Sequence, residues 1–146
     1  MAVSETIVRE FFELHGFFVR QQRKHIAPKR EDDEVDFYVH NPSGPGGESE
    51  VPFVLESAAD LKHLTRAVVV VKAWHTEVFT QAVLAHAPEM FRFAGPETFA
   101  RATHAFGGPG PLTKILVVPA LPATGEARQQ SIDVLRAKGI DAVIAF

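Results

Sequence analysis

The sequence contains no cysteine, and its aromatic residues include only one tryptophan and one tyrosine. Without cysteine the chain forms neither disulfides nor thiolate metal sites, which excludes disulfide-stabilised scaffolds, zinc fingers and thiol catalysis. No apolar run approaches the roughly 20 residues that a membrane-spanning helix needs, and the N-terminus lacks the basic and apolar regions of a secretory signal. We therefore expect a cytoplasmic protein.

An excess of positive charge is also lacking, because the formal net charge of the 146 residues is -3. The chain is not a polycation that binds nucleic acid indiscriminately, so any such contact must be local. One stretch is nevertheless basic, and its members are Arg20, Arg23, Lys24, Lys29 and Arg30. This stretch is either a nucleic-acid-binding stripe or, because residues 31–34 are acidic, a solvated surface whose charges neutralise one another.

Apolar residues are plentiful, at 46% of the chain. This content and the length predict a single domain over residues 1–146 with one continuous core. Most of the 12 phenylalanines should lie in that core, with Phe17 or Phe18 left as a surface anchor. Residues 42–50 concentrate glycine, proline and small polar residues, which predicts a flexible loop rather than a domain boundary.

The first part of the chain predicts a helix followed by a strand. Apolar residues recur with a 3.6-residue period over residues 4–14, with Ser4 as N-cap and Ile7 and Leu14 on the apolar side. Gly16 can adopt the left-handed conformation that ends a helix. Alternation of side chains over residues 17–26 then predicts the first strand.

Two further strands are predicted between residues 35 and 74. Over residues 35–40, Val35, Phe37 and Val39 alternate with Asp36, Tyr38 and His40, which predicts a strand that carries Asp36 on the face opposite to Val35 and Phe37. Residues 67–74 form a β-branched run without alternation, which is typical of a central strand covered on both faces. A short edge strand over 51–55 and a helical turn over 57–64 are expected between them.

The last part of the chain predicts an alternation of helices and strands. The expected helices cover residues 76–87, 96–106 and 125–138, and the expected strands cover 114–118 and 140–146. A strand, a helix and a strand in that order imply a parallel pair joined by a right-handed crossover. The sheet should therefore be mixed, antiparallel at first and parallel at the end.

This order of elements resembles the PD-(D/E)xK restriction-endonuclease-like superfamily. The closest likeness is to its Holliday-junction-resolvase and archaeal restriction-like branch, in which a helix with a glutamate leads through Gly-Phe into a strand. The matching residues here are Glu5 and the stretch Gly16-Phe17-Phe18-Val19-Arg20. The family next places an aspartate in a strand, as Asp36 is placed here, although the usual preceding proline is Val35.

The family's (D/E)-x-K motif falls in the central strand, where this chain has Val70-Val71-Lys72. The lysine matches and the acid does not. The closing stretch 139–144 also resembles the final strand of such domains, whereas residues 42–64 would be an insertion. The resemblance implies an α/β three-layer domain with a mixed central sheet and helices on both faces, and by analogy a homodimer.

In this family two carboxylates hold Mg²⁺, which polarises the phosphodiester, and the lysine stabilises charge near the reacting phosphate. The resemblance therefore implies catalytic roles for Lys72, Asp36 and Glu5, and Asp36 as a metal ligand. With valine at position 70, the Mg²⁺ site would be weak or lost. Glu77, in the predicted helix after the central strand, is the candidate for a displaced metal-binding acid.

Three functions remain open at this point. The leading hypothesis is a nuclease-fold domain that has lost efficient cleavage and keeps a binding or structural role connected with nucleic acid. The second is an active Mg²⁺-dependent phosphodiesterase that uses a displaced carboxylate, and the third is a protein-interaction module. Each candidate residue also has a structural interpretation: Lys72 pairs with Asp36 in an ion pair, and Glu5 and Glu77 favour the positive end of a helix dipole.

Overall fold

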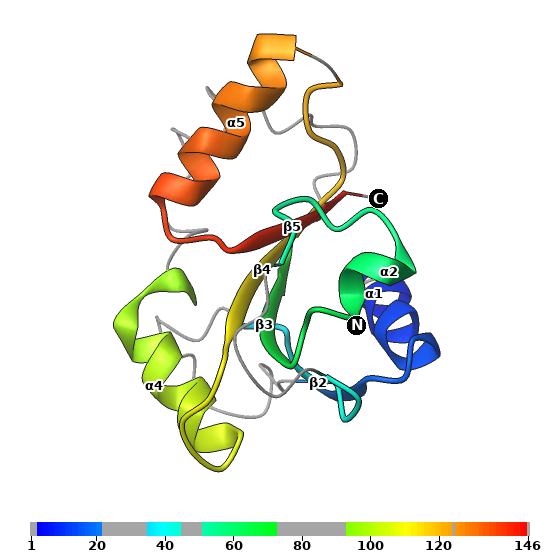
Figure 1. Ribbon diagram of the computed structural model, residues 1–146, viewed down its shortest axis with the longest axis vertical. Helices are drawn as coiled ribbons and strands as arrows, with labels where there is room; N and C mark the ends of the chain where they lie inside the picture. Colours follow the sequence, from blue (N-terminus) through cyan, green and yellow to red (C-terminus); the bar gives the residue numbers. More distant parts are fainter. Residues whose placement is uncertain (1–2, 22–34, 45–50, 73–92, 124, 146) are drawn as a thin grey trace.

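A five-stranded mixed sheet forms the centre of the computed structural model, which describes residues 3–21, 35–44, 51–72, 93–123 and 125–145 (Figure 1). The strands follow one another across the sheet in the order in which they occur in the chain. They are β1 (Phe18–Gln21), β2 (Phe37–His40), β3 (Arg66–Val71), β4 (Thr113–Val118) and β5 (Ala142–Ala145).

The direction of the strands changes at the middle of the sheet. The pairs β1–β2 and β2–β3 are antiparallel, whereas β3–β4 and β4–β5 are parallel. This arrangement confirms the predicted mixed sheet and the parallel closing pair. It also explains the run of valines in β3, because the central strand is covered on both faces and buries Val68, Val69 and Val70 completely.

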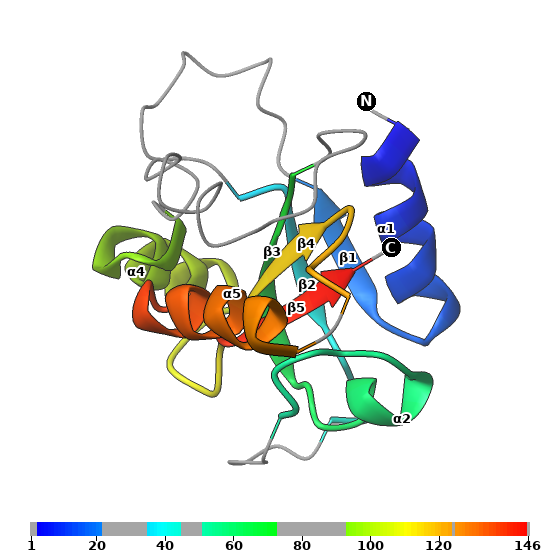
Figure 2. The same cartoon turned by 90° about the horizontal axis from the view of Figure 1, so that it is seen from above.

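Helices cover both faces of the sheet, so the described residues form three layers (Figures 1 and 2). One face carries α4 (Pro96–Ala105) and α5 (Gly125–Ala137), and the other carries α1 (Val3–Leu14) and α2 (Ala58–Leu61). We call these the α4/α5 face and the α1/α2 face. The chain thus has a three-layer α/β architecture.

Each face has its own apolar core. The α4/α5 core contains Phe93, Leu116 and Leu135, and the α1/α2 core contains Phe12 and Phe37. Because β3, β4 and β5 send alternate side chains to the two cores, these strands tie both layers of helices to one sheet.

The two edges of the sheet differ. At the β5 edge, the amide of Leu55 donates to the carbonyl of Val143 at 2.9 Å, and the amide of Val143 donates to the carbonyl of Phe53 at 2.7 Å. Residues 53–55 thus extend the sheet, as the expected short edge strand does. At the other edge, β1 has only β2 as a neighbouring strand within the described residues.

The first helix differs from its prediction in two respects. It begins at Val3, so Ser4 lies inside the helix and is not its N-cap. Ile7 and Leu14 are 50% and 83% exposed, whereas Val8 and Phe12 are buried against the sheet. The 3.6-residue pattern includes more apolar positions than the sheet covers, because a short sheet shields only a narrow stripe of the helix.

Several predicted elements lie outside the described residues: the helix over 76–87, the end of the first strand over 22–26, and residues 45–50 of the expected flexible loop. Of the helices that the structure describes, none has the length and apolar character to cross a membrane.

Candidate functional site

Two residues singled out by the resemblance, Asp36 and Lys72, lie at the same end of two neighbouring strands. Asp36 directly precedes β2, and Lys72 directly follows β3. These strands are antiparallel neighbours with Phe37 opposite Val69, so the start of β2 lies beside the end of β3. The structure therefore places Asp36 and Lys72 at the ends of adjacent strands, on the same end of the sheet, which the nuclease hypothesis requires.

The regular alternation of β2 is interrupted at Asp36. Val35 and Tyr38 both belong to the α4/α5 core, although residues three apart on a regular strand face opposite sides. The amide of Asp36 donates to the carbonyl of Val69 at 2.9 Å, and Val69 is already the partner of Phe37. Two residues thus oppose one, which is the pattern of a β-bulge. The prediction that Val35 lies on the same face as Phe37 is wrong for this reason.

The carboxylate of Asp36 has a defined partner. Its Oδ2 accepts a hydrogen bond of 2.7 Å from the amide of Val71, and the residue is 4% exposed. The carboxylate takes the place of a backbone carbonyl where the bulge interrupts the ladder between β2 and β3. Hydrogen bonds that involve a charged group contribute more to stability than neutral ones, so this contact fixes both strand ends.

The position of the missing acid is filled by the core. Val70 is 0% exposed and packs with Val35 and Leu116 in the α4/α5 core. The strand period places Lys72 on the same side of β3 as Val70, and its amide continues the ladder by donating to the carbonyl of Val117 at 2.9 Å. Val70 thus provides apolar packing where the motif would provide a metal ligand.

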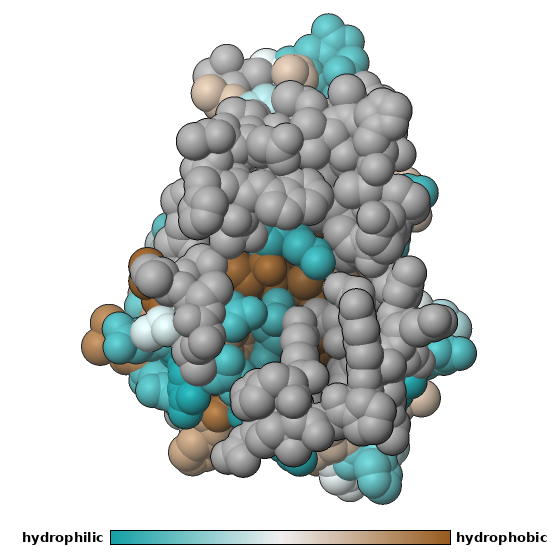
Figure 3. Space-filling model, turned by 180° about the vertical axis from the view of Figure 1, so that it is seen from behind, coloured by the Kyte–Doolittle hydropathy of each residue, from teal (hydrophilic) through white to brown (hydrophobic). Residues whose placement is uncertain are grey.

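Glu5 lies in α1, on the α1/α2 face, toward the same end of the sheet as Asp36 and Lys72. Arg9, one turn after Glu5, donates from its guanidinium to the Gln21 side chain at 3.3 Å, and Gln21 is paired with Phe37 at this end. The N-terminal end of α1 therefore lies near the end of β1, but α1 covers the α1/α2 face, whereas Val70 faces the α4/α5 core. Figure 3 shows the side toward which β3 and β4 end, where apolar and hydrophilic surface of the described residues meet.

The remaining predicted site residues lie outside the described part of the chain: Glu77, Arg23, Lys24, Lys29 and Arg30. Within the described part, no group of three or more histidine, cysteine, aspartate or glutamate residues is arranged to hold a metal ion.

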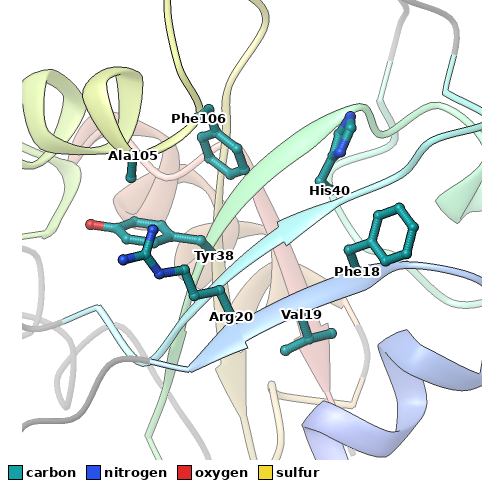
Figure 4. A pocket seen from close by; sticks show the side chains of 7 residues that line it. All are labelled: Phe18, Val19, Arg20, Tyr38, His40, Ala105 and Phe106. Atoms are coloured by element: carbon teal, nitrogen blue, oxygen red, sulfur yellow. The ribbon is translucent and has the colours of Figure 1, made fainter.

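Arg20, the one described member of the basic stretch, lines a groove on the α4/α5 side of β1 and β2 (Figure 4). The groove has a volume of about 170 Å³. Its floor is the paired strands, with Phe18 opposite His40 and Arg20 opposite Tyr38. The end of α4, with Ala105 and Phe106, forms its wall.

The groove combines aromatic rings with basic side chains. Phe18 is 68% exposed at its rim, with its ring centroid 6.4 Å from that of His40. Tyr38 is buried, and its ring meets that of Phe106 edge-on at 5.7 Å. None of the described residues that line the groove is acidic, and Arg20 is the formally charged one among them, so the described lining is aromatic with one positive side chain.

The wall of the groove is held in place from behind. The guanidinium of Arg66 lies over the Phe106 ring at 5.3 Å and donates to the carbonyl of Gly108 at 2.8 Å. It also donates to the carbonyl of Phe106 at 3.4 Å. These contacts fix the turn after α4, so the wall is formed before any ligand arrives.

Sequence reasoning identified Arg20 but not Tyr38 or Phe106 as part of a site. The alternation of β1 and β2 could have placed Phe18, Arg20 and Tyr38 on one face. Nothing in the sequence reveals that Phe106, more than 60 residues later, packs beside them. Phe18 is confirmed as an exposed phenylalanine, and Phe17 is buried in the α1/α2 core.

Comparisons with protein-family models, with curated proteins and with solved structures find no match to this chain.

Proposed function

We propose that this chain is a restriction-endonuclease-like domain that has lost metal-dependent cleavage and serves in nucleic-acid binding. The observation that carries the proposal is the pairing of β2 with β3, which brings Asp36 and Lys72 to one end of the sheet, while Val70, which aligns with the motif acid in the resemblance, is buried. The mixed sheet and the order α1, β1, β2, β3, α4, β4, α5, β5 support the same family resemblance, with α2 in the stretch that the resemblance treats as an insertion.

The loss of cleavage is argued from what surrounds the site. A Mg²⁺ ion needs carboxylate or other oxygen ligands with near-octahedral geometry, and it gives up its water reluctantly. Val70 supplies no oxygen, and the Asp36 carboxylate already accepts the Val71 amide at 2.7 Å. A metal at this position would therefore have one committed carboxylate and an apolar neighbour.

The surface of β1 and β2 next to Asp36 supports the binding role. Arg20 is exposed on β1 and begins the basic stretch of the sequence. Among the described residues, the lining of the groove beneath it includes aromatic side chains and His40 and no acid. Phosphate contacts from arginine and lysine provide most of the affinity of non-specific nucleic-acid binding, so a local basic surface suffices in a chain of net charge -3.

The loss of the metal site is tested by restoring the acid. Val70→Glu places a carboxylate in the α4/α5 core, which lowers the thermal unfolding midpoint because a buried charge is costly. Adding Mg²⁺ at ten times its Kd should recover about 1.4 kcal/mol, or about 3–6 °C in a domain of this size. Val68→Glu is the matched control, because Val68 is equally buried in the same core but one step further from Asp36 along the same face of β3.

Calorimetric titration of the wild-type chain with Mg²⁺ decides the question even if both variants unfold. The proposal expects no binding heat at millimolar Mg²⁺. Binding by the wild type that Asp36→Ala abolishes would contradict the proposal and support an active phosphodiesterase with a displaced acid.

A further inference from the structure

We propose that the groove over β1 and β2 binds one base of a single-stranded nucleic acid, with the base stacked on Phe18 and the adjacent phosphate held by Arg20. This inference rests on the proposed binding function and deepens it by naming the form of the ligand and the residues that contact it. The juxtaposition that carries it is an exposed phenylalanine beside an exposed arginine, above a groove whose described lining residues include no acid.

The size of the groove suits one aromatic ring. Its volume of about 170 Å³ is close to that of a cavity known to accept a benzene-sized ligand, which is about 150 Å³. A planar base can stack on aromatic side chains regardless of its identity, because every base has a π-face. The Phe18 ring is the accessible platform, and the fixed Phe106 ring closes the far side of the groove.

The positive charge of Arg20 favours an anionic ligand. Arg20 and His40 are its polar, exposed side chains, and they flank Phe18 on the same face of the sheet (Figure 4). Val19, between Phe18 and Arg20 in the chain, packs toward the α1/α2 core instead. An aromatic platform flanked by basic groups is the arrangement with which proteins bind single strands, where bases are free to leave the stack.

A protein partner is less well matched to this surface. A specific protein interface buries about 800 Å² per partner and has an apolar centre. The exposed Ile7 and Leu14 belong to α1, on the opposite face of the sheet from the groove, and Phe99, which is 48% exposed on α4, does not line the groove. The groove alone offers a single exposed ring.

The inference is tested by fluorescence anisotropy with labelled ten-nucleotide oligothymidylate and oligouridylate. Phe18→Ala should weaken binding about 5- to 150-fold, the range that stacking of one base contributes. Phe18→Tyr, which keeps the ring, should restore binding to near the wild-type level. Phe99→Ala removes another exposed phenylalanine, on α4 outside the groove, and should leave binding unchanged.

The role of Arg20 has a separate readout. Arg20→Ala should reduce the slope of log affinity against log salt concentration by about 0.7, the contribution of one phosphate contact on a single strand. Phe18→Ala should leave that slope unchanged. Lys62→Ala is the charge-matched control, because Lys62 is exposed beside α2 on the opposite face. It should leave the slope at the wild-type value.

The possible failures separate the two proposals. If the wild-type chain binds neither oligonucleotide, the binding function itself is wrong. If Phe18→Ala binds the oligonucleotides as tightly as the wild type does, the groove is not the site and this inference is overturned, while the binding function stands. If Phe18→Ala instead converts a dimer to a monomer in sedimentation without affecting oligonucleotide binding, the groove is an interface between copies of the chain, which also overturns the inference.

Discussion

Asp36 has a structural role that does not depend on whether the chain is related to nucleases. Its carboxylate accepts the Val71 amide at 2.7 Å, at the bulge where no backbone carbonyl of β2 is in place to do so. A buried amide left without an acceptor costs about 1–3 kcal/mol. In an active nuclease the same residue would be expected to bind a metal. The effect of its substitution on the free energy of unfolding must therefore be measured before any effect on activity is interpreted.

Replacement of Asp36 by alanine should lower the free energy of unfolding by about 1–3 kcal/mol, because the Val71 amide loses its acceptor. Asp36→Asn keeps a side-chain oxygen at the same position, so it should lose clearly less. Urea denaturation of both variants measures the difference. Equal losses for the two variants would show that the negative charge, rather than the hydrogen bond to Val71, is what the fold needs.

Prediction at the residue scale succeeded where the type of side chain indicates whether the position is buried. The buried run Val68 to Val70 has no alternation, which marks it as central, and the sheet places it there. The bulge at Asp36 escaped prediction because an extra residue shifts the alternation without changing the composition. The chemistry of Asp36 depends on that shift, so the sequence identified the residue but not its partner.

At the scale of elements, the order and type of the described helices and strands followed from periodicity and breakers. The helix at Pro96–Ala105 begins with proline and ends before Gly107 and Gly108, which are signals local to the sequence. Which faces the helices cover is a tertiary property, and it left Ile7 and Leu14 exposed against expectation. The fit of Phe106 against Tyr38 is tertiary for the same reason.

The β5 edge of the sheet is closed by residues 53–55, which lie in the stretch that the family resemblance treats as an insertion. The amide of Val143 donates to Phe53, and the amide of Leu55 donates to Val143. Leu55, Leu61 and Leu64 are buried in the α1/α2 core. This stretch therefore contributes to the core and shields a strand edge that would otherwise be open to pairing with another chain.

Hydrogen exchange tests whether this closure is stable. The amide of Val143 should exchange as slowly as those of buried β4, since its acceptor at Phe53 lies in a segment anchored by Leu55. The amide of Leu55 should be protected to a similar degree. Fast exchange at Val143 with slow exchange in β4 would mean that residues 53–55 detach from the sheet in solution.

For the whole molecule, the charge and the position of the two candidate surfaces determine how nucleic acid would be bound. A chain of net charge -3 has no long-range attraction for a polyanion, so affinity must come from a few close contacts. In the proposal those contacts lie around Phe18 and Arg20 on β1, while Asp36 and Lys72 lie at the end of the sheet where β2 begins and β3 ends. The proposed binding surface and the residues that resemble the nuclease motif would therefore share the β1–β2–β3 half of the sheet.

The central claim is that this chain binds nucleic acid without a working metal site, and one measurement tests it most directly. Labelled single-stranded oligonucleotide is titrated with the wild-type chain in EDTA and in Mg²⁺, and the probe is then recovered and sized on a denaturing gel. The account predicts the same affinity in both conditions, binding that weakens as salt rises, and an intact probe. Absence of binding in both conditions, or cleavage of the probe in Mg²⁺ that Lys72→Ala abolishes, would contradict it.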